Sequence, residues 1–167
     1  MVTCALALTV TATAQSKSVY TSTKTRDCKT VRQSSKGAGY YVGQCKGTGG
    51  YKIELLEDDI RQSINVIAPS GTRSELNLWN FFARFSAVGE KIEWRTKKGV
   101  PFALIARFNV SQSDENNKND SYLMISKIAK TGSCVTDIVD PGPNQNETAR
   151  KLADSATGKP CKEPSQN

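Results

Sequence analysis

Apolar and polar residues alternate along much of this chain, and the clearest alternation predicts a β-hairpin. Tyr51, Ile53 and Leu55 recur at every second position, and a second alternating run extends from 60 to 66 after the acidic residues 57–59. Alternation with a period of two places one side of a strand in the core. Because polar residues between two such runs are typical of a turn, we expect two antiparallel strands here.

Other short segments rich in β-favouring residues predict further strands. They cover residues 39–45, 91–96, 101–110, 122–128 and 134–139. Residues 76–85 are strongly apolar but fit either a short helix or pieces of strand. Seven or eight short strands separated by turns favour a mainly β fold, either an antiparallel sandwich or a barrel-like sheet.

One α-helix is expected near the C-terminus. Asn146 can cap this helix, and Glu147 lies in its first turn, where the helix dipole favours negative charge. The apolar residues that follow recur at helical spacing and form one stripe. They are Ala149, Leu152, Ala153 and Ala156. Gly158 and Pro160 then end the helix.

The first fourteen residues differ in kind from the rest and predict a signal peptide. They contain no charged residue and end in Ala12-Thr13-Ala14, a pattern of small residues that signal peptidases cleave. The apolar run is too short to cross a bilayer, which needs about 20 apolar residues. No basic residue precedes it, so we expect translation to start further upstream. The mature chain, without a transmembrane span, is expected to be periplasmic or secreted.

After the signal peptide, the composition divides the chain into two regions. Residues 15–38 are rich in Ser, Thr, Lys and Arg. Apart from a short strand at 19–21, they are expected to form a polar, basic N-terminal arm. Residues 39–167 contain the other predicted strands and the helix, and they are expected to form a single β-rich domain.

The cysteines indicate an oxidising compartment. Cys4 lies in the signal peptide, which leaves four cysteines in the mature chain, and four cysteines allow three pairings. We favour Cys28–Cys45 and Cys134–Cys161, because each of these bonds closes a short loop around one local element. No metal site is expected, since the chain contains no histidine and no C-x-x-C pair.

The net charge of +7 is concentrated in the N-terminal third of the chain. From Lys17 to Lys52 there are eight basic residues and one acidic residue, whereas basic and acidic residues balance in the remainder. Clustered cations attract polyanions, which outside the cytoplasm are anionic lipids or acidic glycans; solubility is the alternative role of such charges. The candidate binding residues are Lys24, Arg26, Lys29, Arg32 and Lys36. A nucleic-acid partner is not expected, because no recognised binding motif accompanies the charge.

The chain offers little for catalysis, and no cofactor is expected. Without histidine the commonest general base is missing, and paired cysteines leave no free thiol. The glycine-rich segment 43–52 lacks the Gly-Lys-Ser/Thr ending of a phosphate-binding loop and is interpreted as a turn. A carboxylate pair drawn from Glu54, Glu57, Asp58 and Asp59 would suit a glycosidase-like hydrolase, which is the third hypothesis.

Large aromatic residues are concentrated in one short span. They are Trp79, Phe81, Phe82, Phe85 and Trp94. Burial in the core is the favoured interpretation, because large aromatic side chains are mostly buried. An exposed apolar patch or groove is the alternative, since adjacent aromatic residues in one strand cannot both point inward.

The order of these features resembles that of small uncharacterised envelope proteins of Gram-negative bacteria. The residues that carry the resemblance are Tyr20-Thr21, Cys28, the glycine-rich turn with Cys45, residues 57–61, 92–95 and 102–107, Cys134, and the 149–156 helix before Cys161. The resemblance covers most of the mature chain. It implies a location in the envelope and carries no activity.

A second resemblance is to periplasmic lysozyme inhibitors, small disulfide-bearing β proteins that place a Ser-Gly loop in the lysozyme cleft. Ser70, Gly71 and Arg73 carry this resemblance. Many lysozymes are basic, however, and so is this chain. We therefore expect a non-enzymatic, exported binding protein that contacts an anionic envelope lipid or glycan, or a protein partner. A lysozyme inhibitor is the alternative.

Overall fold

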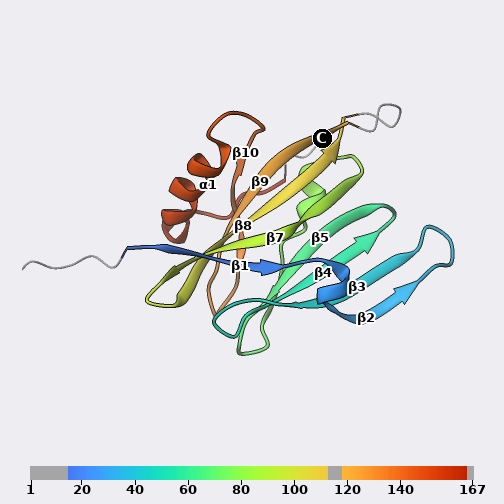
Figure 1. Ribbon diagram of the computed structural model, residues 1–167, viewed down its shortest axis with the longest axis horizontal. Helices are drawn as coiled ribbons and strands as arrows, with labels where there is room; N and C mark the ends of the chain where they lie inside the picture. The colour runs from blue at the N-terminus through green and yellow to red at the C-terminus, as the bar shows by residue number, and fades with distance from the viewer. Residues whose placement is uncertain (1–14, 113–117, 165–167) are drawn as a thin grey trace, which may run out of the picture.

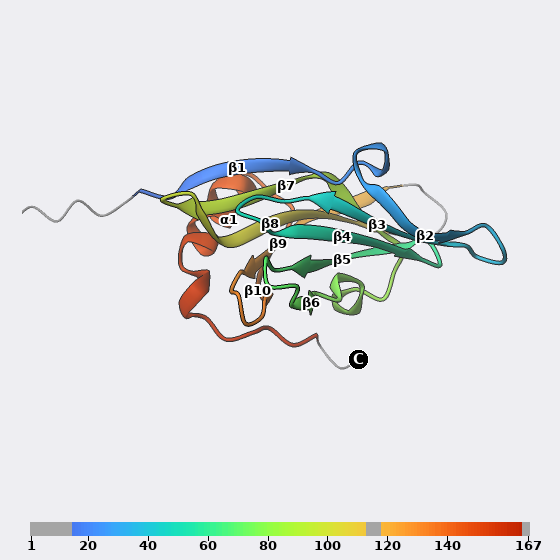
Figure 2. The ribbon, with the colours of Figure 1, turned by 90° about the horizontal axis from the view of Figure 1, so that it is seen from below.

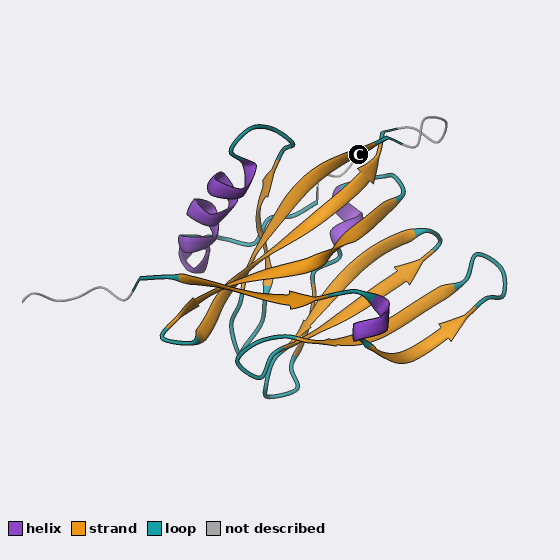
Figure 3. Cartoon of the chain, viewed as in Figure 1, coloured by secondary structure: helices purple, strands orange, loops and turns teal. Residues whose placement is uncertain are grey.

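Strands dominate the computed structural model of the protein, which describes residues 15–112 and 118–164 (Figures 1 and 3). The mainly β fold with a C-terminal helix is therefore confirmed, and the sheet is not closed into a barrel. The predicted signal peptide, with Cys4, lies outside the described residues.

The described residues form ten strands, one α-helix and three short 3-10 helices, so the sequence pattern underestimates the number of strands. The elements are β1 (Lys17–Ser22), η1 (Thr25–Asp27), β2 (Lys29–Ser34), β3 (Tyr40–Lys46), β4 (Lys52–Asp58), β5 (Arg61–Ile67), β6 (Arg73–Glu75), η2 (Leu78–Phe81), β7 (Ser86–Lys97), β8 (Val100–Ser111), β9 (Asn119–Lys127), β10 (Cys134–Val139), α1 (Gln145–Asp154) and η3 (Ala156–Gly158).

The strands form one sheet that consists of two antiparallel halves. The order is β10-β9-β8-β7-β5-β4-β3-β2, with β1 paired to β7 and β6 paired to β5. The halves meet where β5 and β7 run parallel through a single residue pair, Arg61 and Ser86. β1 and β7 lie along one side of the molecule, and β5 and β6 lie toward the other (Figure 2). The expected antiparallel hairpin is present as β4 and β5.

The main core contains residues from both halves of the sheet. Ile53 and Ile64 contribute from one half and Trp94 from the other, and all three are 0% exposed. Trp94 packs against Tyr51, with 6.2 Å between the ring centroids, and its Nε1 donates a hydrogen bond to Thr21 Oγ1 at 2.8 Å. Burial of so large a side chain from the second half fixes how the two halves approach each other.

Gly47 allows the turn between β3 and β4 to reach this tryptophan. A Cβ atom at this position would lie 2.5 Å from the carbonyl oxygen of Tyr51 and 2.9 Å from the ring of Trp94. Both contacts are too close for any residue except glycine. The glycine-rich segment 43–52 is thus the end of one strand, a turn and the start of the next, with no helix after it.

A smaller core forms where α1 covers one face of β8 and β9. Ala149 and Ala153 of the helix pack on Ile105 and Ile125, and the short alanine side chains allow close approach. Figure 1 shows α1 beside β9 and β10. The helix begins earlier than Asn146, the expected cap, because the preceding residue Gln145 is already tied to the sheet. Its side-chain amide donates to the carbonyl oxygens of residues 121, 139 and 140. Asn144 occupies the N-cap position instead.

Residues 15–38 belong to the sheet, whereas their composition predicts a polar arm. β1 pairs with β7 from Lys17 opposite Thr96 to Ser22 opposite Lys91, and β2 pairs with β3. Both are edge strands, where polar side chains stay exposed and no regular alternation of apolar residues is needed. The hydrophobic pattern therefore reveals only the short stretch around residues 19–21.

A network of charged side chains holds β1 and α1 against β7. Glu93 of β7 is 9% exposed and accepts hydrogen bonds from Arg150 Nε at 2.7 Å and Ser18 Oγ at 2.5 Å. Two residues along β7, Arg95 donates from Nε and one terminal nitrogen to the two carboxylate oxygens of Asp154, both at 2.9 Å. One arginine and one carboxylate therefore come from α1, and the matching pair comes from β7.

Glu93 and Asp154 are both held in their charged forms. Burial alone would raise the pKa of Glu93, but hydrogen bonds from Arg150 and Ser18 and the charges of two arginines outweigh burial and lower it. Burial likewise opposes the fall in the pKa of Asp154, which the hydrogen bond and charge of Arg95 produce. A carboxylate with a lowered pKa stabilises the fold above its ordinary pKa, and this contribution is lost as the pH falls through the lowered value.

We expect Glu93→Gln to lower the free energy of unfolding by about 2 kcal/mol at pH 7, because it leaves Arg150 without a carboxylate. The deficit should shrink as the pH falls below 4.5, the ordinary pKa of this carboxyl, because the unfolded parent chain then takes up a proton, and it should disappear once folded Glu93 is protonated at its lowered pKa. Urea unfolding measured between pH 7 and pH 2 tests this. Glu147→Gln, which removes an exposed carboxylate from the same helix, is the control and should change stability little. A deficit that does not vary with pH would contradict the role of the charge.

Candidate functional site

Both disulfides expected from the cysteine spacing are present. Cys28–Cys45 joins the start of β2 to β3, and Cys134–Cys161 joins β10 to the segment after η3. Cys45 is 1% exposed, so the first bond anchors the edge strand β2 to the main core. This matters for the candidate site, because most of the predicted basic residues lie on or beside β2.

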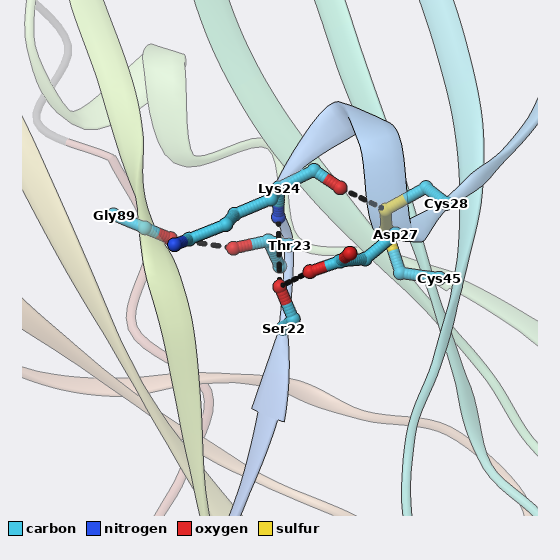
Figure 4. Close-up of a disulfide and its surroundings, with 7 residues drawn as sticks. All are labelled: Ser22, Thr23, Lys24, Asp27, Cys28, Cys45 and Gly89. Atoms are coloured by element: carbon cyan, nitrogen blue, oxygen red, sulfur yellow. Dashed lines mark hydrogen bonds between the residues drawn. A yellow bond between two sulfur atoms is a disulfide. The ribbon is translucent and has the colours of Figure 1, made fainter.

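The segment between β1 and β2 is fixed by short polar contacts (Figure 4). Ser22 Oγ donates to Asp27 at 2.6 Å, and Thr23 Oγ1 donates to the carbonyl oxygen of Gly89, also at 2.6 Å. Lys24 Nζ lies 3.3 Å from a carboxylate oxygen of Glu90. Its charge is thus partly neutralised by β7, which sets Lys24 apart from the other predicted binding residues.

Lys29 and Arg32 lie on the same face of β2 because of a β-bulge. Residues three apart in a regular strand point to opposite faces. Here the register shifts by one residue between Thr30 and Arg32, so Lys29 is opposite Gln44 and Arg32 is opposite Val42. Gln44 and Val42 share one face of β3, and directly paired residues point to the same side. Both cations are exposed.

Two further lysines extend this face onto the neighbouring strands. Lys46 at the end of β3 is directly opposite Lys52 at the start of β4, and Lys46 is two residues beyond Gln44 on the same face. We call Lys29, Arg32, Lys46 and Lys52 the basic face. All four are exposed. The composition also singles out Arg26 and Lys36. Arg26 is exposed in η1, and Lys36 is exposed in the turn between β2 and β3.

The directly opposed lysines of the basic face could have been found from the sequence. They flank the glycine-rich turn, so a hairpin over residues 40–58 pairs them once its register is known. Directly opposed side chains have Cβ atoms about 4.5–5.5 Å apart, and like charges at this distance are unfavourable. Lys52 Nζ finds partial compensation by donating to Gln44 Oε1 at 3.3 Å.

Next to the basic face, Arg73 of β6 neutralises the one buried acid in this region. Arg73 lies in the same row as Lys46 and Lys52, separated from them by Ile67 of β5. It donates to Glu54 at 2.8 Å, and the other oxygen of Glu54 accepts from Asn65 Nδ2, also at 2.8 Å. Glu54 therefore adds no free negative charge to the face.

Of the acidic residues of the third hypothesis, Glu54 is not brought together with Glu57 or Asp58. Glu54 and Glu57 are three residues apart in the regular strand β4, so their side chains point to opposite faces. Glu57 accepts a hydrogen bond from Gln62 at 2.6 Å. Glu54 and Asp58 share a face, but four residues of strand separate their Cα atoms by about 13 Å. Carboxyl groups of glycosidases lie about 5–9.5 Å apart, so this geometry does not favour a carboxylate pair.

The Ser-Gly loop of the alternative hypothesis lies in the turn between β5 and β6. Ser70 and Gly71 are exposed, and Gly71 has φ +89°, a conformation that favours glycine. Arg73, the third residue of that resemblance, is bonded to Glu54 and is about half exposed. No observation in the structure favours inhibition of lysozyme over another role for this loop.

A cavity of about 370 Å³ lies beside the basic face. Arg32 lines it together with Val42, Leu56 and the aromatic residues Tyr40 and Trp79. Tyr40 is 44% exposed. The sequence pattern alone does not place Trp79 here, because it comes from η2, which is distant from β2 and β3 along the chain.

Two other kinds of feature are absent from the described part of the chain. Residues 15–112 and 118–164 contain no cluster of three or more metal-ligating side chains. Within the same residues, no helix is long and apolar enough to cross a membrane.

Comparison with known proteins gives no relative. No protein-family model matches the chain, and neither the curated proteins nor the solved structures contain one that matches it. The function is therefore inferred from the geometry alone.

We expect Lys52→Glu to raise the free energy of unfolding by about 0.2–1 kcal/mol, because it converts a directly opposed like-charged pair into an attractive one. The gain should shrink at high salt, which screens exposed charges. Urea unfolding at 20 mM and 500 mM NaCl measures both effects. Lys130→Glu, at another exposed lysine, is the control for net charge. Equal changes for the two variants would contradict the pairing of Lys46 with Lys52.

Proposed function

We propose that this protein is an exported, non-enzymatic binding protein whose basic face contacts phosphate-bearing lipid headgroups of the cell envelope. The observation that carries the proposal is the direct opposition of Lys46 and Lys52, together with the bulge that brings Lys29 and Arg32 to the same side. A bound anion relieves the repulsion between the opposed lysines, so the fold supplies part of the driving force for binding.

The layout of the four cations suits an extended anionic surface. Val42, opposite Arg32, and Lys46 are four residues apart on β3, a distance of about 13 Å along the strand. Lys29 and Lys52 lie on strands to either side of β3, about 5 Å away in each direction. Four cations spread over such an area can each meet a different phosphate. Each basic residue near an anionic membrane contributes about 1 kcal/mol of binding free energy.

Export is supported by the two disulfides. Disulfides persist in the periplasm and outside the cell, whereas the cytosol keeps thiols reduced. The Cys28–Cys45 bond also has a direct role in the proposal, because it secures the start of β2 next to Lys29. The predicted cleavage after Ala14 would leave every residue of the basic face in the mature chain.

Charge reversal of the whole basic face tests the proposal. We expect a variant with Lys29, Arg32, Lys46 and Lys52 changed to Glu to bind anionic phospholipid vesicles at least one hundred-fold more weakly at 50 mM salt, since four favourable contacts of about 1 kcal/mol become repulsive. Cosedimentation with vesicles of stated anionic content measures the affinity. Binding of the parent protein should also weaken steeply as salt is raised.

The matched control reverses four exposed lysines elsewhere and makes the same change in net charge. These are Lys98, Lys130, Lys151 and Lys162. We expect this variant to retain vesicle binding within about tenfold of the parent protein. The proposal is wrong if both variants lose binding equally, or if the parent protein binds acidic polysaccharides but not anionic vesicles.

A further inference from the structure

A second, larger cavity lies beyond the end of β4, at the other end of that strand from Lys46 and Lys52 of the basic face. Its volume is about 990 Å³, at the upper end of the range of about 300–1,000 Å³ that is usual for ligand sites. Its walls come from the β4–β5 turn, the segment after η2, the end of β8 and the start of β9. Of the candidate residues identified from the sequence charges or from the Ser-Gly motif, Asp59 lines it and the basic candidates do not.

Backbone hydrogen bonds join these walls, so the cavity is formed by the fold itself. The N–H group of Ser86 donates to the carbonyl oxygen of Ile60 in the β4–β5 turn, at 3.4 Å. The N–H group of Ser111 at the end of β8 donates to the carbonyl oxygen of Phe85, at 2.9 Å. The segment 82–86 is thereby fixed between the hairpin turn and β8.

One wall of the cavity is aromatic and continuous with the main core, whereas the other lining residues are mostly polar or charged. Phe82 lies against Tyr122, with 4.5 Å between ring centroids, and against Phe108 at 5.6 Å. Val110, at 4% exposed, and Phe81 complete this surface. An apolar lining of this kind favours an apolar body in the ligand, because burial removes its surface from water.

The segment after η2 and the β4–β5 turn each carry an exposed apolar residue. Phe85 lines the cavity and is 41% exposed. Ile60 is 65% exposed and has φ +59°, a left-handed conformation that is strained for a β-branched residue. Glycine or asparagine is the usual residue in such a hairpin turn. Asp59, with φ +49°, and Ile60 form the two-residue loop between Asp58 and Arg61, so both positive φ values belong to the turn type that such hairpins favour, and only the choice of isoleucine is unusual.

Two arginines at the cavity have no ion-pair partner among the described residues. Arg61 and Arg84 line the cavity, and neither forms a salt bridge within residues 15–112 and 118–164. Arg84 uses one nitrogen to donate to the carbonyl oxygen of Gln112. The remaining guanidinium donors can bind the two oxygens of a carboxylate or phosphate.

Two acidic residues, Asp59 and Asp120, also line the cavity. They weaken the preference for an anionic head group less than their number suggests. Asp120 already accepts a hydrogen bond from Gln112 Nε2 at 2.8 Å. Asp59 is at the exposed tip of the hairpin turn, where its carboxylate remains in contact with water. The arginines therefore determine which head group is preferred at the rim.

We propose that this cavity binds a single-chain amphiphile with an anionic head group, either a carboxylate or a phosphate. The alkyl chain of the ligand lies against Phe81, Phe82 and Tyr122, and its head group is bound by Arg61 and Arg84. Phe85 covers the part of the alkyl chain nearest the opening. This site is separate from the basic face and takes a single molecule, whereas the basic face contacts a surface.

Calorimetric titration with four twelve-carbon probes below their micelle concentrations tests this proposal. They are dodecanoate, dodecyl phosphate, dodecanol and dodecyltrimethylammonium. We expect one molecule of an anionic probe to bind at least tenfold more tightly than the cationic probe, with dodecanol between them. A preference for dodecanoate or for dodecyl phosphate identifies the head group, and either preference supports the site.

Three variants locate the binding. Changing Arg61 and Arg84 together to Ala should weaken the anionic probes at least tenfold and leave the cationic probe within threefold. Phe85→Ser, at an exposed position that the fold tolerates, should weaken all four probes. The charge-reversed basic face should leave dodecanoate binding within threefold, which separates this site from the vesicle-binding surface.

Several results would overturn the proposal. Equal binding of the anionic and cationic probes would remove the role of the arginines. Unchanged binding in the double arginine variant would do the same. Loss of dodecanoate binding in the charge-reversed basic face, with no loss in the arginine variant, would show that the anionic probes bind the basic face instead.

Discussion

The positions of β1 and α1 depend on the network of charged side chains that joins both elements to β7. β1 is a polar edge strand, and the buried residues of α1 are alanines, so neither element buries much apolar surface. Glu93 and Arg95, two residues apart on β7, face the helix and bind Arg150 and Asp154. Because each charge has a partner of opposite sign at hydrogen-bonding distance, the cost of removing these groups from water is largely offset.

The fixed position of β1 in turn places the basic residues that follow it. β1 leads directly into η1, and the Cys28–Cys45 bond then connects the start of β2 to the main core. Without these two attachments, β2 would be an edge strand held by β3 alone. The same edge position leaves its side chains exposed, so a strand that contributes little to the core is available for binding.

The two proposed sites have different lining residues and use different physical interactions. The basic face depends on long-range attraction between exposed charges, which is strong at low salt and weak at high salt. The cavity depends on burial of an apolar chain against aromatic rings, which salt hardly weakens, with the arginines selecting the head group. A protein that contacts a lipid surface with one site and holds a single amphiphile in the other would combine both interactions.

The sequence by itself determined the strand-rich class, the β4–β5 hairpin, the C-terminal helix and the cysteine pairs, because each depends on local spacing. It did not reveal β2, whose exposed residues show no alternation, or the bulge that places Lys29 and Arg32 on one face. The neighbours of Trp79 and Arg84 come from strands that are distant along the chain, so only the tertiary structure shows them. Local patterns of apolar residues indicate which residues are buried. The position of an exposed charge or of a cavity depends instead on the register between strands, and tertiary packing sets that register.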